Sequence, residues 1–488
     1  MRNLLTLSAL LGVTTAGTVS VDVRKQLPAE LQEILKIHRR AGSDPIVQLQ
    51  AINNVTGGGY YGDLGIGTPP QVLSFHLDTG SSDTWVNLKG IDFCEEGRPE
   101  LGLPPSCLKQ FDPKSSSTFK TTIRNGFKIK YLDNSSSSGD YFNDTVTIGD
   151  SITIKQQQLG LARQSGTATG LMGLGMSVGV AARKEYPTIV DNLVSQGHIE
   201  TAAFSLYLDS ITESHGSFLF GGIDSKKYFG DLATLPLVPD DIHGSDNVTS
   251  YAVNLGSFSV DGMSLPSLKT KAILDTGATL VLLPGRVVDP VHEKLGVLSI
   301  PSLSTPFIDC AAANKDTKTK FNFQFDGKTI SVPLKEMIIN SFEGHQDIFK
   351  DPRLGGRFKN MDKVCMFGIA SADHYKIPQQ SDPYSTGSSS SQGPEYALLG
   401  DTFLRSAYVV YNLARQEVSI AQAYPKSNET NIVTLKANSA IPAIKGMDSP
   451  AENDEKKSAA GLVRPPSATT AAAAVVLLGL AATAVGAL

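Results

Sequence analysis

The chain has 488 residues, of which 41% are hydrophobic, 45 are glycine and one is tryptophan. This length is enough for two or three domains with sizeable cores, which excludes disorder as the default state of the chain. Lysine and arginine number 43 against 48 aspartate and glutamate residues, a net charge of −5 without a long basic block, which argues against a nucleic-acid partner.

The first 40 residues carry the pattern of two segments that are removed from an exported protein. A basic start and a short apolar run lead to small residues near position 17, which predicts a signal peptide over residues 1–17, too short to span a membrane. Apolar residues then recur at helical spacing and the stretch closes on Arg39-Arg40. We interpret residues 18–40 as a propeptide that ends at this dibasic processing site. A surface helix of the mature protein is the alternative.

Alternating strand and turn signals follow and predict a mainly β protein, in which one motif occurs twice. Asp78-Thr79-Gly80 and Asp275-Thr276-Gly277 each follow an apolar run, and their aspartates lie 197 residues apart. This separation, about the size of a domain, suggests lobes over residues 41–235 and 236–424 that each supply one carboxylate to a shared cleft. Neighbouring carboxylates share a proton, so one acts as base and the other as acid. A plain turn is the alternative for one copy, but two matching copies argue against it.

Four cysteines form two pairs that are local in the sequence, Cys94 with Cys107 and Cys310 with Cys365. An even count in an exported chain predicts two disulfides, one in each lobe, although four cysteines allow three connectivities. Cys94 and Cys107 bracket a loop rich in Gly and Pro that a disulfide would close. A reduced cytosolic chain is the alternative, against which the export signals of the termini argue.

Several motifs between Tyr60 and Ala423 together carry the resemblance to a known family. They are the strand Tyr61 to Gln71, Asp78 to Ser82 with Trp85 after it, Gly170 to Gly175, Asp275 to Gly277 and Leu398 to Arg405. On these residues the chain resembles the pepsin family of aspartic endopeptidases, and within it the fungal, cell-surface yapsin type. The resemblance implies a mainly β, bilobal acid-protease fold with the active-site cleft between two β-rich lobes. It also implies Gly-containing apolar segments that cross behind each catalytic loop, and protein or peptide substrates.

A hairpin beyond the first motif resembles the lid of this family, which is called the flap. Tyr131 matches the flap tyrosine, whose hydroxyl the Trp85 indole would hold, while Leu132 departs from the commoner glycine. Asp133 would overhang the cleft, where its carboxylate could pair with Lys or Arg of a substrate. A solvated turn aspartate is the alternative for Asp133, and a strand aromatic is the alternative for Tyr131.

The expected reaction is hydrolysis of a peptide bond at acidic pH by a water held between Asp78 and Asp275. It needs no metal, no other cofactor and no covalent intermediate, and we expect a monomer. Ser81 is placed to donate a hydrogen bond to the Asp78 carboxylate, whereas the corresponding Ala278 has no hydroxyl. Asp275 should therefore form a less stabilised anion, which shifts the acidic optimum upward. The substrate-binding part of the site is predicted to include Gly80, Gly277 and Thr279.

Other catalytic chemistries find no support in the sequence. It contains no His-Glu-x-x-His, no Gly-x-Ser-x-Gly and no phosphate-binding loop. Two other classes of function stay open. One is a catalytically silent, protease-like wall or binding protein, and the other is a structural glycoprotein of the cell surface.

Beyond Tyr424 the composition changes to polar and small residues, which predicts a stalk over residues 425–458. The small residues Ser458, Ala459 and Ala460, a spacer and an apolar tail form the pattern of a glycosylphosphatidylinositol (GPI) attachment signal. The anchor would be attached at Ser458, and residues 459–488 would be removed. The mature protein would then lie at the outer leaflet of the plasma membrane or in the cell wall. A plain C-terminal membrane anchor is the alternative.

Five sequons fit N-glycosylation along a secretory route, at Asn54, Asn134, Asn143, Asn247 and Asn428. Each one alone is a weak signal. A glycan on Asn134 would obstruct the predicted flap, so we expect this sequon to be the least used.

Overall fold

The structure is a computed structural model that describes fourteen stretches of the chain. They are residues 17–25, 59–95, 107, 109–132, 135–149, 151–213, 215–240, 242, 246–300, 305–344, 346–354, 356–374, 395–437 and 439–448. The chain divides into a unit that ends at Met447 and a second unit from Asp448 onward. Every element described below belongs to the first unit.

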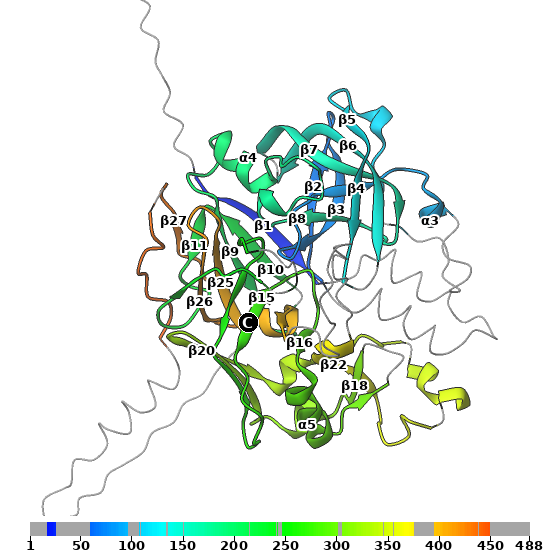
Figure 1. Cartoon of the computed structure of the whole chain (residues 1–488), viewed down its shortest axis with the longest axis vertical. Coiled ribbons are helices and arrows are strands. Elements are labelled where there is room, and N and C mark those ends of the chain that lie inside the picture. Colours follow the sequence, from blue (N-terminus) through cyan, green and yellow to red (C-terminus); the bar gives the residue numbers. More distant parts are fainter. Residues whose placement is uncertain are drawn as a thin grey trace, which may run out of the picture. The chain divides into compact units, whose positions relative to one another are not determined.

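A sheet of 13 strands in the described part of the chain joins segments that are far apart in sequence, in the order β12-β26-β25-β9-β10-β1-β2-β3-β8-β4-β7-β6-β5. Figure 1 shows the blue and cyan strands of this sheet in the upper part of the body and the green and orange strands below them. The strands are β1 (Val19–Arg24), β2 (Tyr61–Ile66), β3 (Gln71–Asp78), β4 (Trp85–Asn87), β5 (Lys120–Lys130), β6 (Ser136–Ile148), β7 (Ile152–Ser165), β8 (Gly170–Gly173), β9 (Ala203–Leu208), β10 (His215–Phe220), β12 (Ala233–Pro236), β25 (Ala407–Asn412) and β26 (Glu417–Gln422).

Strand β1 lies within the predicted propeptide and is an internal member of this sheet. It pairs antiparallel with β10 from Val19 to Arg24, and Arg24 also pairs with Tyr61 of β2. Its three valines are buried and alternate with exposed residues, as expected for a strand with one face on the core. The Arg24 guanidinium also donates to the two carboxylate oxygens of Asp63 at 2.8 and 3.0 Å. The start of the chain's described part is therefore bound to the body by backbone and side-chain contacts.

The second half of the chain repeats part of this arrangement in a five-stranded sheet, ordered β13-β15-β24-β16-β23. Strand β3 pairs parallel with β8, and β15 pairs parallel with β24 in the same way. Each of the two Asp-Thr-Gly motifs therefore follows a strand with a parallel neighbour on one side. The strands of this sheet are β13 (Ala252–Leu255), β15 (Thr270–Leu274), β16 (Val281–Leu283), β23 (Ile369–Ser371) and β24 (Ala397–Leu399).

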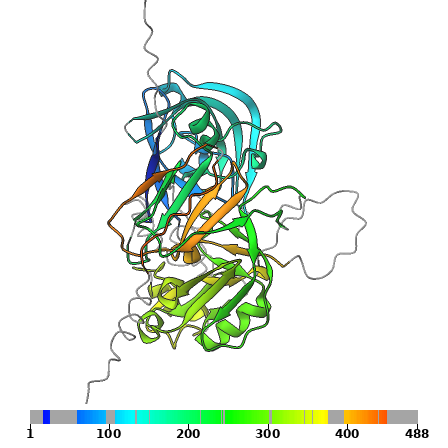
Figure 2. The ribbon, with the colours of Figure 1, turned by 90° about the vertical axis from the view of Figure 1, so that its left-hand side faces the viewer.

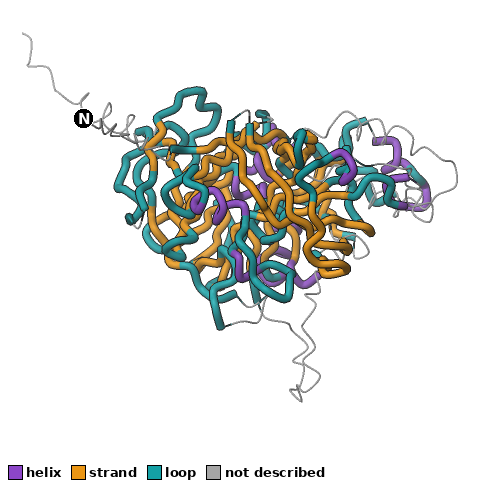
Figure 3. Tube along the Cα trace, turned by 90° about the horizontal axis from the view of Figure 1, so that it is seen from above, coloured by secondary structure: helices purple, strands orange, loops and turns teal. Residues whose placement is uncertain are grey.

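Smaller sheets and short helices complete the body, and Figure 3 shows how far strands outweigh helices. The remaining strands are β11 (Gly222–Asp224), β14 (Ser257–Val260), β17 (Leu298–Ser299), β18 (Pro306–Asp309), β19 (Lys320–Phe325), β20 (Lys328–Pro333), β21 (Ile338–Ile339), β22 (Val364–Phe367) and β27 (Ile432–Thr434). The helices are α3 (Asp92–Glu95), α4 (Ile189–Ser195), α5 (Gly285–Leu295), α6 (Ala312–Lys315) and α7 (Asp401–Leu404). Short 3-10 helices are η2 (Pro113–Ser115), η3 (Ser177–Gly179), η4 (Leu334–Met337), η5 (Gln346–Lys350), η6 (Pro352–Leu354) and η7 (Ala372–His374). The prediction of a mainly β protein is confirmed.

One hydrophobic core continues from the first half of the body into the second. At their junction Phe204 of β9 stacks on Tyr411 of β25 with ring centroids 4.8 Å apart, and Tyr251 meets Tyr411 edge-on at 4.6 Å. All three rings are buried. Both expected disulfides are present, Cys94–Cys107 and Cys310–Cys365. Each one closes a loop within one half of the body.

Part of the predicted stalk packs on the body. Strand β27 pairs antiparallel with β11, and Leu435 after it is only 3% exposed. The backbone N–H of Met447 donates to the Tyr228 carbonyl at 2.8 Å, and that of Gly446 donates to Gly230 at 2.7 Å. Figure 2 shows these brown segments beside the green and orange strands. The described residues include no helix that is long and apolar enough to cross a membrane.

Candidate active site

The two repeated motifs meet where the halves of the body join. Asp78 ends β3 and Asp275 follows β15, and their side chains are only 4% and 9% exposed. A Cβ on Gly80 would lie 2.5 Å from Asp275 Oδ1, and a Cβ on Gly277 would lie 2.3 Å from Asp78 Oδ1. Each loop therefore lies against the carboxyl of the other, at a distance that only glycine permits. The Gly80 and Gly277 N–H groups donate at 2.7 Å to the Oδ1 atoms of Asp78 and Asp275, respectively.

The threonine of each motif binds the opposite loop. Thr79 and Thr276 accept hydrogen bonds at their hydroxyls from each other's backbone N–H groups. Their hydroxyls donate onward to backbone carbonyls of the opposite strand, Thr79 to Leu274 and Thr276 to Leu77. Both threonines are nearly inaccessible to solvent. This exchange holds the two aspartates in register.

A Gly-containing segment supports each loop from behind, as the resemblance implied. Behind the first loop, the Leu174 N–H donates to the Asp78 carbonyl at 2.8 Å. Behind the second, the Asp275 N–H donates to the Leu399 carbonyl at 3.1 Å, and the Asp401 N–H donates to the Ala278 carbonyl at 2.8 Å. The backbone of both loops is therefore bonded to a neighbouring strand.

The two carboxyls have different electrostatic surroundings. Burial raises the pKa of Asp275 well above its usual range, and the neighbouring Asp78 carboxyl raises it further, against a smaller opposing effect of the Gly277 N–H. Asp78 in turn accepts a short hydrogen bond from the Ser81 hydroxyl, which stabilises its charged form. The corresponding Ala278 has no hydroxyl. The arrangement therefore favours a proton on Asp275.

The hairpin of β5 and β6 carries the residues expected for a flap. At its end, Tyr131 accepts a hydrogen bond at Oη from the Trp85 indole Nε1 at 2.8 Å. The Tyr131 N–H donates to the Ser135 carbonyl at 2.9 Å, which closes the turn. Leu132 packs on a cluster of buried apolar residues that all come from the second half of the chain. The end of the hairpin, which belongs to the first half, therefore contacts the second half. Asp133 and Asn134 lie outside the described residues.

A buried carboxylate that sequence reasoning did not single out fixes the base of this hairpin. Asp83 accepts hydrogen bonds from Tyr141 Oη of β6 at 2.8 Å, from Tyr186 Oη at 2.6 Å and from the Ala181 N–H at 2.6 Å. Because Asp83 follows the first Asp-Thr-Gly-Ser-Ser run, these bonds join the flap strand to the loop that carries Asp78. The aspartate directly before Thr84-Trp85 was the available signal for this contact.

Residues 59–423 match the family described as Eukaryotic aspartyl protease. The chain belongs to this family. It is 33% identical over 419 residues to the probable aspartic-type endopeptidase OPSB of Arthroderma benhamiae, covering 83% of this chain and 76% of that protein. It is 30% identical over 398 residues to the aspartic proteinase yapsin-3 of Saccharomyces cerevisiae, covering 78% of this chain and 68% of that protein.

The crystal structure of the aspartic proteinase from Irpex lacteus has the same fold. Its TM-score is 0.56 at 21% sequence identity, and the match covers 85% of this chain and 99% of that one. The pepsin-like bilobal architecture expected from the sequence is therefore confirmed. With its relatives, the chain is an aspartic endopeptidase that acts on proteins or peptides.

Another buried carboxyl of the protease, Asp401, lies close to the catalytic loops. Asp401 begins α7 and accepts a hydrogen bond at Oδ2 from the Gly59 N–H at 3.1 Å. Burial raises the pKa of Asp401 to about 7, although Lys25 and Arg405 act in the opposite direction. Its charge contributes in turn to the raised pKa of Asp275. The sequence showed Asp401 only as part of the closing motif.

A buried ion pair joins α7 to the 3-10 helix η4. The Arg405 Nε donates to Glu336 Oε2 at 2.9 Å, and the two side chains are 0% and 5% exposed. The Ser210 hydroxyl donates to Glu336 Oε1 at 2.7 Å. Burial alone would raise the pKa of Glu336, but Arg405 and Ser210 outweigh it and the pKa lies below its usual value. Sequence reasoning did not find this pair, because its members are 69 residues apart.

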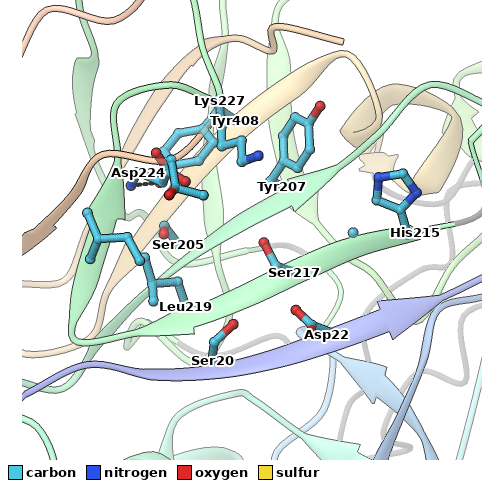
Figure 4. Close-up of a pocket in the computed structure, with 13 residues that line it drawn as sticks. Ser20, Asp22, Ser205, Tyr207, His215, Ser217, Leu219, Asp224, Lys227 and Tyr408 are labelled. Atoms are coloured by element: carbon cyan, nitrogen blue, oxygen red, sulfur yellow. Dashed lines mark hydrogen bonds between the residues drawn. The ribbon is translucent and has the colours of Figure 1, made fainter. Parts of the chain in front are cut away.

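A pocket of about 190 Å³ lies on the large sheet among residues remote in sequence from both Asp-Thr-Gly motifs. Figure 4 shows Ser20 and Asp22 of β1, His215 and Ser217 of β10, and Tyr207 of β9 around it. None of the residues predicted for the active site lines this pocket. The pocket therefore plays no part in the catalytic arrangement.

The remaining predicted site residues are dispersed. Thr279 is partly buried and accepts a hydrogen bond at its carbonyl from the Thr402 N–H at 3.1 Å, so its backbone supports the loop after Asp275. Of the sequons, Asn247 and Asn428 are exposed, whereas the Oδ1 of Asn143 is buried. The predictions for Asn54, Asn134 and the Ser458 attachment site concern residues outside the described part.

Proposed function

We propose that the protease hydrolyses peptide bonds with Asp78 and Asp275 as its catalytic pair, at acidic pH and at the cell surface. One observation carries the catalytic assignment: each loop glycine lies against the carboxyl of the opposite loop, which makes the two buried aspartates neighbours. Since each half of one chain supplies one carboxyl, the site is complete in a monomer. The residues present require neither a metal nor another cofactor for this chemistry.

The proposed mechanism follows from the unequal surroundings of the pair. A water between the carboxyls loses a proton to ionised Asp78 and attacks the carbonyl carbon of the scissile bond. Asp275, which holds its proton because its pKa is raised, donates that proton to the carbonyl oxygen. When the tetrahedral intermediate collapses, the C–N bond breaks, the proton on Asp78 passes to the leaving amine and the oxygen returns its proton to Asp275. The pair is then restored.

The catalytic assignment is tested by Asp78→Asn and Asp275→Asn in the full chain. Each variant should lose more than about 1,000-fold in kcat/KM, because the pair can no longer carry one proton and one charge. Asp326→Asn, at an exposed turn, is the matched control and should leave activity unchanged. A statine-type inhibitor should block the wild type. Retained activity in either active-site variant would refute the assignment.

The proposed preference for basic residues rests on Asp133 beside the flap tyrosine. A carboxylate at this point of the flap would attract a Lys or Arg side chain next to the scissile bond. Asp133→Ala should reduce kcat/KM for peptides with Lys or Arg and leave peptides with Leu or Phe unchanged. An equal loss on both classes would show that Asp133 does not select the substrate.

The proposed cell-surface location is supported by the two terminal signals and by two disulfides, which persist in exported proteins. A phospholipase C specific for phosphatidylinositol should release the expressed full chain from intact cells. A chain that ends at residue 457 lacks the proposed attachment signal and should be secreted directly. If the full chain stayed on the membrane after phospholipase treatment, a plain membrane anchor would be the better interpretation.

A further inference from the structure

His76 lies on the strand that delivers Asp78. In β3 the side chains of Phe75 and Leu77 are fully buried in the core, so His76 and Asp78 occupy the opposite face. Two residues along a strand are separated by about 7 Å. A charge on the imidazole is therefore close enough to act on the Asp78 carboxylate.

The imidazole is enclosed by backbone and an aromatic ring. A Cβ on Gly59 would lie 2.7 Å from His76 Nε2, so the ring packs directly on the Gly59 backbone. The ring of Tyr61, its cross-strand partner on β2, has its centroid 5.4 Å away. Within the described part of the chain, Nε2 is buried and has no hydrogen-bond partner. The parallel neighbour β8 consists of Gly, Leu and Met, so this strand offers the polar ring no polar side chain.

Several titratable groups surround this ring. Asp78 is on the same strand, and Tyr61 is on β2. Asp401 of α7 accepts a hydrogen bond from the N–H of Gly59, the residue on which the ring packs. Lys25 and Arg405 lie beside Asp401 and partly compensate its charge. Burial is the largest effect and lowers the pKa of His76 below its usual value, although the Asp78 carboxylate and the Thr276 backbone carbonyl act in the opposite direction. The Asp78 carboxylate favours the protonated form of His76. By thermodynamic linkage, the protonated ring favours the ionised form of Asp78 to the same extent.

We propose that His76 is a positioning residue of the catalytic pair, whose protonated ring keeps Asp78 ionised and so extends activity to lower pH. This inference rests on the proposed function of Asp78 and Asp275. The pair is active with one proton, and activity falls in acid when it takes up a second. A neighbouring imidazolium opposes that second proton because it stabilises the remaining negative charge.

The test is the pH dependence of kcat/KM for one peptide substrate, measured on the full chain between about pH 2 and 7. In His76→Leu and His76→Gln the acid limb should move upward by roughly 0.5 to 1 pH unit. The control is His215→Gln, whose side chain is 57% exposed and pairs with Asp209, and its acid limb should coincide with that of the wild type. A lower plateau with an unmoved acid limb would mean that His76 only fills space, and would overturn the proposal.

Asp78→Asn, measured in parallel, separates this proposal from the catalytic assignment. If Asp78→Asn stays active, the catalytic assignment fails. If Asp78→Asn is inactive and both His76 variants keep the wild-type acid limb, the assignment stands and only the role of His76 is wrong. Should His76→Leu not fold, His76→Gln carries the test, because its amide keeps a polar group against Gly59 without a titratable charge.

Discussion

Thr79 and Thr276 exchange hydrogen bonds across the junction of the two halves, each backbone N–H donating to the other's hydroxyl oxygen at 3.0 Å. The hydroxyl protons are used as well, from Thr79 to the Leu274 carbonyl at 2.9 Å and from Thr276 to the Leu77 carbonyl at 2.8 Å. Because both threonines directly follow the aspartates, these four bonds fix how the carboxyls face each other. Stability and catalysis should therefore change together when the exchange is broken.

Thr79→Val and Thr276→Val test this coupling. Each substitution removes a hydroxyl and leaves a buried N–H without an acceptor, which should cost about 1–3 kcal/mol of unfolding free energy. The double variant should lose less than the sum, since both residues belong to one exchange. Urea unfolding and kcat/KM measure the two effects, with exposed Thr329→Val of β20 as control. Strict additivity would mean that the two threonines act independently.

Ala278→Ser should make the pair more symmetric. A hydroxyl at this position would donate to the Asp275 carboxylate as Ser81 donates to Asp78, and so lower the raised pKa of Asp275. The pair would then lose its last proton at lower pH, and the basic limb of the kcat/KM profile should move down by roughly 0.5 to 1 unit. The complementary Ser81→Ala should move the acid limb up. An unmoved basic limb in Ala278→Ser would contradict the explanation for the high pKa.

Glu336→Gln should destabilise the protein most at neutral pH. Removing one partner of a buried ion pair costs about 3–5 kcal/mol, because Arg405 keeps an uncompensated charge. The pKa of Glu336 is below its usual 4.5, so its contribution is present above that value and is lost as the pH falls through the lowered pKa. The stability difference from wild type should therefore shrink below about pH 4.5. The surface pair of Asp347 with Lys350 supplies the control: Asp347→Asn should cost under about 1 kcal/mol.

Tyr131→Phe should lower kcat/KM about 10-fold, because the Trp85 indole would lose the hydrogen bond that positions the flap. The folded state should be little affected, since the hairpin is also held by β5–β6 pairing. Tyr228→Phe is the matched control. The Tyr228 hydroxyl also makes one hydrogen bond of 2.8 Å, which it donates to the Ile444 carbonyl in the C-terminal segment. Equal kinetic losses in the two variants would indicate a general loss of stability rather than a flap effect.

Local pattern was enough to predict a mainly β protein with two disulfides, one in each half. The connectivity stayed open among three possibilities, and the bilobal fold was implied by the resemblance to the family. A strand, an Asp and a Gly turn are readable within ten residues, and the repetition of the motif indicated two halves. Contacts between distant segments were not readable. The hydroxyls of Thr79 and Thr276 were visible in the sequence, but their partners lie in the other half, and Glu336 gave no local signal of its pairing with Arg405. His76 was read as part of an apolar run because its neighbours are core residues.

Strand β1 gives the predicted processing step an unusual outcome. Six residue pairs join it to β10, and Arg24 is held by both β2 and Asp63. Cutting the chain after Arg40 would break one covalent bond and none of these contacts. The product would be a two-chain enzyme, in which the short N-terminal peptide contributes an internal strand of the large sheet.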